Sequence, residues 1–228
     1  EGTRLPADTA DGLKPYICAG MDCKSLNEYL GCFDTLLKVL QMEQGLYQAA
    51  RDLGVNLKEK GLRYAEVRFA PQLHCQKGMG QEKAVAAVLS GLAKAQEDSD
   101  IRLRTILCCM RGQDNKQANL QTVRLASRYL GKGVAAVDLA GAEALFPTAD
   151  YEEEFALARE LGVPFTIHAG EAAGPASIRK AVEFGAARIG HGVRAIEDEE
   201  LMELLASREI PLEMCPISNL QTKAVENI

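Results

Sequence analysis

The most constraining feature of this chain is an alternation of strand-like and helix-like segments that begins near residue 63. Residues 63–70, RYAEVRFA, alternate apolar and charged side chains with the period of two that a half-buried strand requires. Shorter apolar runs follow, separated by stretches with helical spacing of apolar residues. The predicted strands are residues 63–70, 101–110, 134–140, 163–168, 187–190 and 209–214.

This alternation favours an α/β fold with a parallel sheet covered by helices. Such a sheet either stays open, as in doubly wound folds, or closes into a barrel, and the alternation alone fits both. The chain contains no G-x-G-x-x-G or G-x-x-x-x-G-K-[ST] loop, which weakens the nucleotide-binding open-sheet option.

The residues before 63 are predicted to be a helical preamble and not a separate domain. An initial stretch rich in Pro, Gly and Asp is predicted to be a loop. Ser25 followed by Glu28 is a capping-box signature, so a helix is expected to begin there. A second helical stretch is expected around residues 46–53.

Composition excludes several classes of partner. The net charge of −6 and the sequence pI of about 5.3 argue against nucleic acid binding. No apolar run approaches the ~20 residues of a membrane span, and the polar N-terminus does not resemble a signal peptide. Seven cysteines, an odd number without a C-x-x-C pair, favour reduced and mostly buried thiols in a cytoplasmic protein.

All the histidines lie at or just past the carboxyl end of a predicted strand, at His74, His168 and His191. In a parallel barrel these ends form the active-site mouth. Neighbouring strands are about 4.8 Å apart, so His168 and His191 are expected to face one bound species. Glu171 follows His168 in a Gly-flanked turn, and Asp138 ends the preceding strand.

Imidazole and carboxylate groups at such a mouth suit metal-assisted hydrolysis, because imidazole is a good Zn²⁺ ligand. The same side chains could instead satisfy the hydrogen bonds of the loops. The pattern by itself leaves both interpretations open.

Five motifs resemble those of the adenosine/AMP deaminase family, in family order and with family-like separations. They are YAEVRFAP at 64–71, DLAGAE at 138–143, TIHAGE at 166–171, IGHG at 189–192 and CPISN at 215–219. The resemblance implies a (β/α)8 barrel whose second to seventh strands are present here. It divides the chain into a helical lid segment, residues 1–62, and one barrel domain, residues 63–228.

The resemblance also implies the roles of three residues in zinc-dependent deamination. His168 would be a zinc ligand, and Glu171 would be the general acid that protonates purine N1. His191 would hold the attacking water and help to deprotonate it.

Three further residues would line the purine pocket by the same resemblance. The backbone N–H of Gly141 would contact purine N3, and Ser218 or Asn219 would support the pocket wall.

The sequence departs from the family pattern in its zinc ligands. The H-x-H pair of the first barrel strand and the late Asp-Asp motif of the family are not found in this chain. We therefore expect a chain incomplete at both ends that holds Zn²⁺ poorly through His168 alone. Open barrel edges would favour self-association.

The leading functional prediction is hydrolysis of adenosine or 2′-deoxyadenosine to inosine and ammonia, weak or absent in this chain alone. One alternative is a deaminase of adenine or another 6-aminopurine. The other is a non-catalytic barrel fragment that associates with itself. The expected partner is a purine nucleoside, with no nucleic acid and no membrane.

Four further polar residues have structural interpretations. Glu66 and Arg68 are expected to pair with each other inside the barrel, and His74 to be a loop or surface histidine. Asp138 could orient the loop of Gly141 or be catalytic, and the structural role is the one expected.

Overall fold

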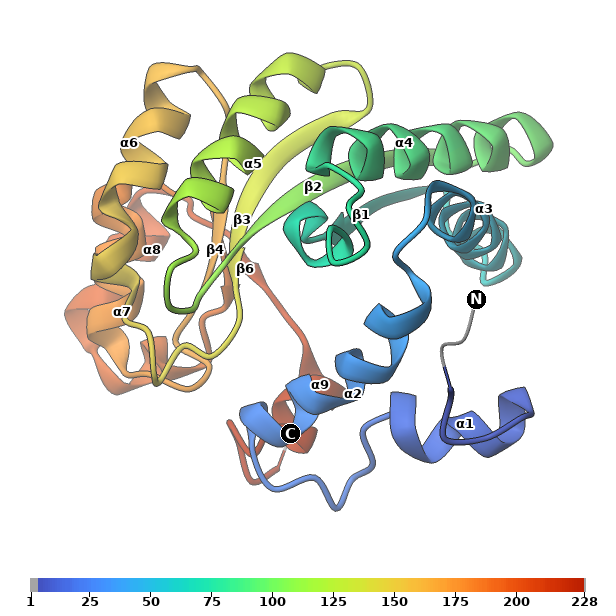
Figure 1. Cartoon of the computed structure of the whole chain (residues 1–228). Coiled ribbons are helices and arrows are strands. Elements are labelled where there is room, and N and C mark those ends of the chain that lie inside the picture. The colour runs from blue at the N-terminus through green and yellow to red at the C-terminus, as the bar shows by residue number, and fades with distance from the viewer. Residues whose placement is uncertain (1–3, 228) are drawn as a thin grey trace.

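The computed structural model describes residues 4–227 and contains the predicted alternation of strands and helices (Figure 1). The fourth strand begins three residues later than expected, because Pro164 lacks the N–H that a sheet ladder requires. The sixth is only two residues long, since Pro211 and Pro216 bound it closely. The strands are β1 (Tyr64–Phe69), β2 (Arg102–Met110), β3 (Val134–Ala140), β4 (Thr166–Ala169), β5 (Arg188–His191) and β6 (Leu212–Glu213).

Helices separate the strands as the sequence predicted, but two of the described helices, one near the N-terminus and one after the sixth strand, were not predicted. The stretch expected to be a loop contains a helix, and the hydroxyl of Thr9 caps it by accepting from the Gly12 N–H at 3.1 Å. The helices are α1 (Ala10–Ile17), α2 (Leu26–Val39), α3 (Glu43–Glu59), α4 (Gln81–Asp98), α5 (Lys116–Tyr129), α6 (Glu152–Glu160), α7 (Pro175–Phe184), α8 (Glu199–Ser207) and α9 (Pro216–Gln221). Short 3₁₀ turns are η1 (Pro71–His74), η2 (Thr148–Tyr151) and η3 (Val193–Glu197).

The capping box at the start of α2 is confirmed. The Ser25 hydroxyl accepts a hydrogen bond from the Glu28 N–H at 3.2 Å. The Glu28 carboxylate reaches back to the N–H of Lys24 at 2.9 Å, one residue before the cap. Two backbone donors at the start of the helix are thereby satisfied.

The six strands are parallel and lie side by side in chain order. One ladder joins β1, β2 and β3, and another joins β4, β5 and β6. A parallel bridge between Val137 and Phe165 connects the two ladders, and the Val137 N–H donates to the Pro164 carbonyl at 3.0 Å. Sequential order, with no reversal of strand direction, is the arrangement of a (β/α)8-type barrel and not of a doubly wound sheet.

Ion pairs across the interior show how strongly the strands curve. Arg68 of β1 donates to both carboxylate oxygens of Glu213 of β6, at 2.8 and 2.7 Å. Arg188 of β5 contacts Glu66 of β1 at 2.6 Å and Glu213 at 3.1 Å. Glu66 and Arg68 therefore lie in the interior as expected, but they pair with residues of β5 and β6 instead of with each other. Arg68 also lies 3.4 Å from the Asp138 carboxylate of β3.

The apolar core lies between the strands and the helices that cover them. A larger cluster includes Leu107, Leu139 and Ile167 on the strands and Phe155 of α6, and a smaller one joins α3 and α4 to β1 and β2. The alternate residues of β1 that face away from the interior, Ala65, Val67 and Phe69, pack on the smaller cluster.

The N-terminal helices occupy two different places. Helix α3 packs closely on α4, where the absence of side chains on Gly54 and Gly91 allows the backbones to approach. Helices α1 and α2 lie below the strands, and α2 is next to α9 (Figure 1). Gln221 donates to the Ala19 carbonyl at 2.6 Å, and Lys223 donates to the Met21 carbonyl at 2.9 Å.

The structure bears on two expectations from composition, the absence of membrane spans and the burial of the thiols. Within residues 4–227, no helix is both long enough and apolar enough to cross a membrane. All seven cysteines lie in this range as free thiols, but only Cys23, Cys108 and Cys109 are buried, so the expectation of mostly buried thiols is wrong.

Candidate functional site

Asp138 of β3 and His168 of β4 meet at the carboxyl ends of neighbouring strands. Nδ1 of His168 lies 2.8 Å from one carboxylate oxygen of Asp138 and 3.1 Å from the other. Asp138 is fully buried, whereas 23% of the His168 side chain is exposed. With Nδ1 engaged by the carboxylate, Nε2 is the nitrogen left for another partner. A carboxylate bound to the second nitrogen is the usual support of a metal-ligating histidine.

The electrostatics of this pair favour opposite charges. Burial lowers the pKa of His168, but the Asp138 carboxylate outweighs it, so the pKa lies above its usual value. Burial raises the pKa of Asp138, and the attraction of His168 and Arg68 outweighs it, so the pKa lies below its usual value. Asp138 therefore orients His168, and not the loop of Gly141 as the sequence suggested.

His191 ends β5 beside His168, with ring centroids 5.3 Å apart. Its Nδ1 is 2.7 Å from the side-chain oxygen of Asn219 on α9, and its Nε2 is 3.4 Å from the Glu171 carboxylate. His191 also has a backbone φ of 61°, a left-handed conformation that is uncommon outside glycine and concentrated at functional sites. The structure thus brings together the histidine, glutamate and asparagine predicted from separate motifs.

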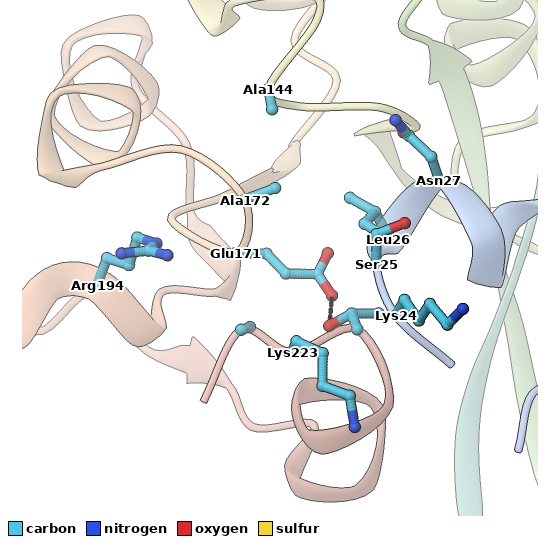
Figure 2. Close-up of a pocket in the computed structure, with 11 residues that line it drawn as sticks. Lys24, Ser25, Leu26, Asn27, Ala144, Glu171, Ala172, Arg194 and Lys223 are labelled. Carbon is cyan, nitrogen blue, oxygen red and sulfur yellow. Dashed lines mark hydrogen bonds between the residues drawn. The ribbon is translucent and has the colours of Figure 1, made fainter. Parts of the chain in front are cut away.

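Glu171 is buried and points into a cavity of about 240 Å³. Thr222 donates to its Oε1 at 3.0 Å. Figure 2 shows the carboxylate directed between the C-terminal segment and the start of α2, where Ser25 and Leu26 form the opposite wall. Residues far apart in sequence therefore enclose the predicted proton donor.

Gly141 follows β3 with a φ of +114°, which side chains rarely tolerate. A Cβ at this position would lie 3.3 Å from Cβ of Arg111. Arg111 is itself buried and donates to the Phe146 carbonyl, to the Thr148 hydroxyl and to the His168 carbonyl, at 2.6, 3.0 and 2.7 Å. Nothing in the sequence indicated this arginine, whose partners lie in the segment after β3, including η2, and on β4.

Two other predicted residues lie outside this group. Ser218 is half-buried on α9, beside Asn219. His74 is buried on η1, where its Nδ1 contacts the Leu40 carbonyl at 2.6 Å. His74 lies on η1, in the connection between β1 and α4, which confirms its interpretation as a loop histidine. Its expected surface exposure is wrong, because the segment before α3 covers the side chain.

Glu143 is the residue whose role the sequence left unassigned. Its carboxylate accepts hydrogen bonds from the N–H groups of four successive residues, Gly170 to Ala173, and from the Ser177 hydroxyl. The turn that carries Glu171 is therefore built around a carboxylate from the preceding loop. The DLAGAE motif was the only feature of the sequence that pointed to Glu143. The motif does not indicate which groups donate hydrogen bonds to the Glu143 carboxylate.

The donor set fits zinc in one respect. His168 presents an imidazole that is partly exposed and supported by a carboxylate, as a zinc ligand requires. Among residues 4–227, no three His, Cys, Asp or Glu side chains lie close enough together to hold a metal ion. His168 is thus the residue of the described chain that we assign to the metal.

The fold and this site together define a hydrolase of the barrel type. The sequence profile of the adenosine deaminase family matches residues 1–228, and the chain belongs to that family. An adenosine deaminase of Haemophilus ducreyi is 54% identical over 232 residues, which cover 100% of this chain and 67% of the relative. The chain therefore spans about two thirds of the length of this relative.

Solved structures agree with the fold. An adenine deaminase from Arthrobacter aurescens superposes with a TM-score of 0.86 at 26% identity, over 98% of this chain and 67% of that one. An amidohydrolase from Burkholderia ambifaria with bound Zn has a TM-score of 0.85 at 22% identity, over 95% and 60% of the two chains. At that lower identity the likeness concerns the fold alone.

Proposed function

We propose that this protein takes part in the hydrolytic deamination of adenosine to inosine, or of 2′-deoxyadenosine to 2′-deoxyinosine, with release of ammonia. The observation that carries the proposal is the buried pair of Glu171 and His191, 3.4 Å apart beside a cavity of about 240 Å³. Membership of the adenosine deaminase family and the 54% identity to an adenosine deaminase support the substrate.

The residues of this chain divide the proton transfers between them. Glu171 donates a proton to purine N1, which makes C6 electrophilic. His191, held by Asn219, accepts a proton from the water whose oxygen adds to C6. The C6–N bond then breaks and ammonia leaves with the proton returned by His191. The second proton of the added water passes from the C6 oxygen to the Glu171 carboxylate, which leaves the C6 carbonyl of the product and restores the acid. The Gly141 N–H binds purine N3, and Ser218 and Asn219 support the wall.

Zinc, when bound, lowers the pKa of the attacking water toward neutrality. His168 is the ligand that this chain supplies, supported by Asp138. One imidazole cannot hold zinc tightly, so turnover by the 228-residue chain alone is weak.

The first experiment measures zinc content and adenosine turnover for the 228-residue chain and for a form extended at both ends to the length of its relatives. We expect bound zinc and turnover in the extended form. Equal activity in both forms would contradict the proposed weakness of the short chain. Absence of turnover in both would contradict the proposed activity and favour a non-catalytic, self-associating barrel.

In the active form, Glu171→Gln should lower kcat by about 100-fold or more, because the amide cannot donate the proton that a carboxylic acid supplies. Glu183→Gln is the matched control, since Glu183 forms an exposed ion pair with Lys180 on α7. Steady-state kinetics with adenosine measure both variants. Unchanged kcat in Glu171→Gln would exclude the assigned role.

Adenine is the second candidate substrate, because the Arthrobacter structure that superposes on this chain is an adenine deaminase. A panel of adenosine, 2′-deoxyadenosine and adenine at equal concentration separates the two. A larger kcat/KM for adenine would overturn the preference for the nucleoside.

A further inference from the structure

The turn that carries Glu171 surrounds the carboxylate of Glu143 with hydrogen-bond donors. One oxygen of Glu143 accepts from the Gly170 N–H at 2.7 Å and the Ser177 hydroxyl at 2.6 Å. The other accepts from the N–H groups of Glu171, Ala172 and Ala173, at 3.0, 2.7 and 3.1 Å. Successive N–H groups that converge on one point form an anion-binding concavity. Here the anion is a side chain of the same molecule.

The hydrogen bonds of the turn are the contacts that replace water around the Glu143 carboxylate. The side chain is only 2% exposed, and the described residues place no Lys or Arg nitrogen within 4.0 Å of it. Burying a carboxylate without partners would be very costly, and the hydrogen bonds of the turn compensate for its lost contact with water. The carboxylate and the turn therefore stabilise each other.

Glu143 stands between two parts of the proposed site. Gly141, which offers its N–H to purine N3, precedes it by two residues in the loop after β3. Glu171, which protonates purine N1, has its own N–H bound to the Glu143 carboxylate. The distance between the Gly141 N–H and the Glu171 carboxyl group thus depends on the Glu143 carboxylate.

The turn itself has little freedom to adapt. Gly170 has a φ of +73°, and a Cβ there would lie 2.4 Å from Cδ1 of Ile178. Its backbone is consequently fixed by packing on one side and by Glu143 on the other. A shift of the loop after β3 would be transmitted directly to Glu171.

We propose that Glu143 is a positioning residue for the deamination, which holds the Gly141 loop and the Glu171 turn at the spacing that one purine ring requires. This inference rests on the proposed function. Glu143 acts through Glu171 and does not contact the substrate.

The geometry is tested by hydrogen exchange, followed by mass spectrometry, on the 228-residue chain. Glu143→Gln keeps the shape but offers only one acceptor oxygen, so the amides of residues 170–173 should exchange at least about 10-fold faster. Glu154→Gln is the matched control, because Glu154 is equally buried but contacts Asn119 on α5. Unchanged exchange of residues 170–173 in Glu143→Gln would overturn the proposal.

The catalytic consequence is tested in whichever form turns over adenosine. Glu143→Gln should lower kcat by about 100-fold, the effect expected for a proton donor displaced by roughly 1 Å. Glu143→Asp keeps two acceptor oxygens and should recover part of the loss, although it is the smaller side chain. A purely space-filling role predicts the reverse order.

A double-mutant cycle asks whether Glu143 acts through Glu171. In a Glu171→Gln background, the added Glu143→Gln should lower kcat by less than about 3-fold. A full 100-fold further loss would overturn the proposal. If the wild-type forms lack turnover while exchange at residues 170–173 still responds, the proposed function fails and the coupling of Glu143 to the turn remains.

Discussion

The two histidines of the site are held by chemically different partners. His168 is bound by the ionised Asp138, whereas His191 is bound by the neutral amide of Asn219. A carboxylate partner increases the basicity of an imidazole, which suits a metal ligand. An amide oxygen fixes the orientation of the ring without adding a charge. At the scale of single residues, this difference supports the assignment of His168 to the metal and of His191 to the water.

His74 provides a pH-dependent test of stability. Burial lowers its pKa, and the hydrogen bond to the Leu40 carbonyl offsets this only in part. The unfolded chain therefore binds a proton more readily than the folded chain once the pH falls below about 6.5. The stability contributed by neutral His74 is complete above that pH and is lost as the pH falls toward the lowered pKa.

The prediction is that the free energy of unfolding falls more steeply in the wild type than in His74→Asn between about pH 7 and about pH 5. The asparagine amide keeps a donor near Nδ1 but does not titrate. Urea unfolding at several pH values measures both slopes. Parallel curves would show that His74 does not contribute to the pH dependence.

At the scale of elements, the sequence predicted the strands best where one face is polar and one apolar. Residues 64–69 alternate without interruption, and β1 covers that range. The sequence also predicted α2 from Ser25 and Glu28, because a capping box is a local signal. It missed α1, whose residues contain Gly12 and Pro15, both poor helix formers.

The site was predictable to the extent that its residues occur in motifs. His168, Glu171 and His191 could be placed at strand ends, and the structure brings them together. The contacts of Glu143 and Arg111 could not be inferred, because most of their partners are backbone groups, 27 or more residues away along the chain. Backbone N–H and C=O groups are present at every position and leave no pattern in a sequence.

The α3–α4 contact gives a prediction at the same scale. A Cβ on Gly91 of α4 would lie 2.3 Å from the Tyr47 carbonyl and 2.9 Å from Cβ of Ala50, both on α3. Gly91→Ala should therefore lower the free energy of unfolding by about 1–3 kcal/mol, despite the better helix propensity of alanine.

Gly31 of α2 is the matched control, because a Cβ there meets nothing within 4 Å. Gly31→Ala should raise the free energy of unfolding by about 0.5–1 kcal/mol. Thermal and urea unfolding compare the two variants. A stabilising effect of Gly91→Ala would mean that the two helices are not in close contact.

At the scale of the whole molecule, interior ion pairs connect β6 both to β1, at the other end of the strand order, and to its neighbour β5. Glu213 of β6 binds Arg68 of β1 and Arg188 of β5, and all three side chains are between one fifth and one third exposed. The contribution of these ion pairs to the free energy of unfolding should lie between that of exposed pairs and that of fully buried pairs. These contacts span the interior and so report on the curvature of the strand array.

Glu213→Ala should lower the free energy of unfolding by about 2 kcal/mol, because two guanidinium groups lose a shared partner. Glu200→Ala is the control, since Glu200 is 90% exposed and lies 3.6 Å from Arg179 on the outer surface. Its effect should not exceed about 0.5 kcal/mol. Equal losses in the two variants would indicate that the interior pairs add no more than surface pairs.

The hydrogen bonds from Gln221 to Ala19 and from Lys223 to Met21 have a consequence for synthesis on the ribosome. Each joins residues 202 positions apart, and together they hold the start of α2 against the Glu171 cavity. At about 5–20 residues per second, the first of these partners waits roughly 10–40 s for the second to emerge. The cavity is thus assembled only after the strands that support it have been synthesised.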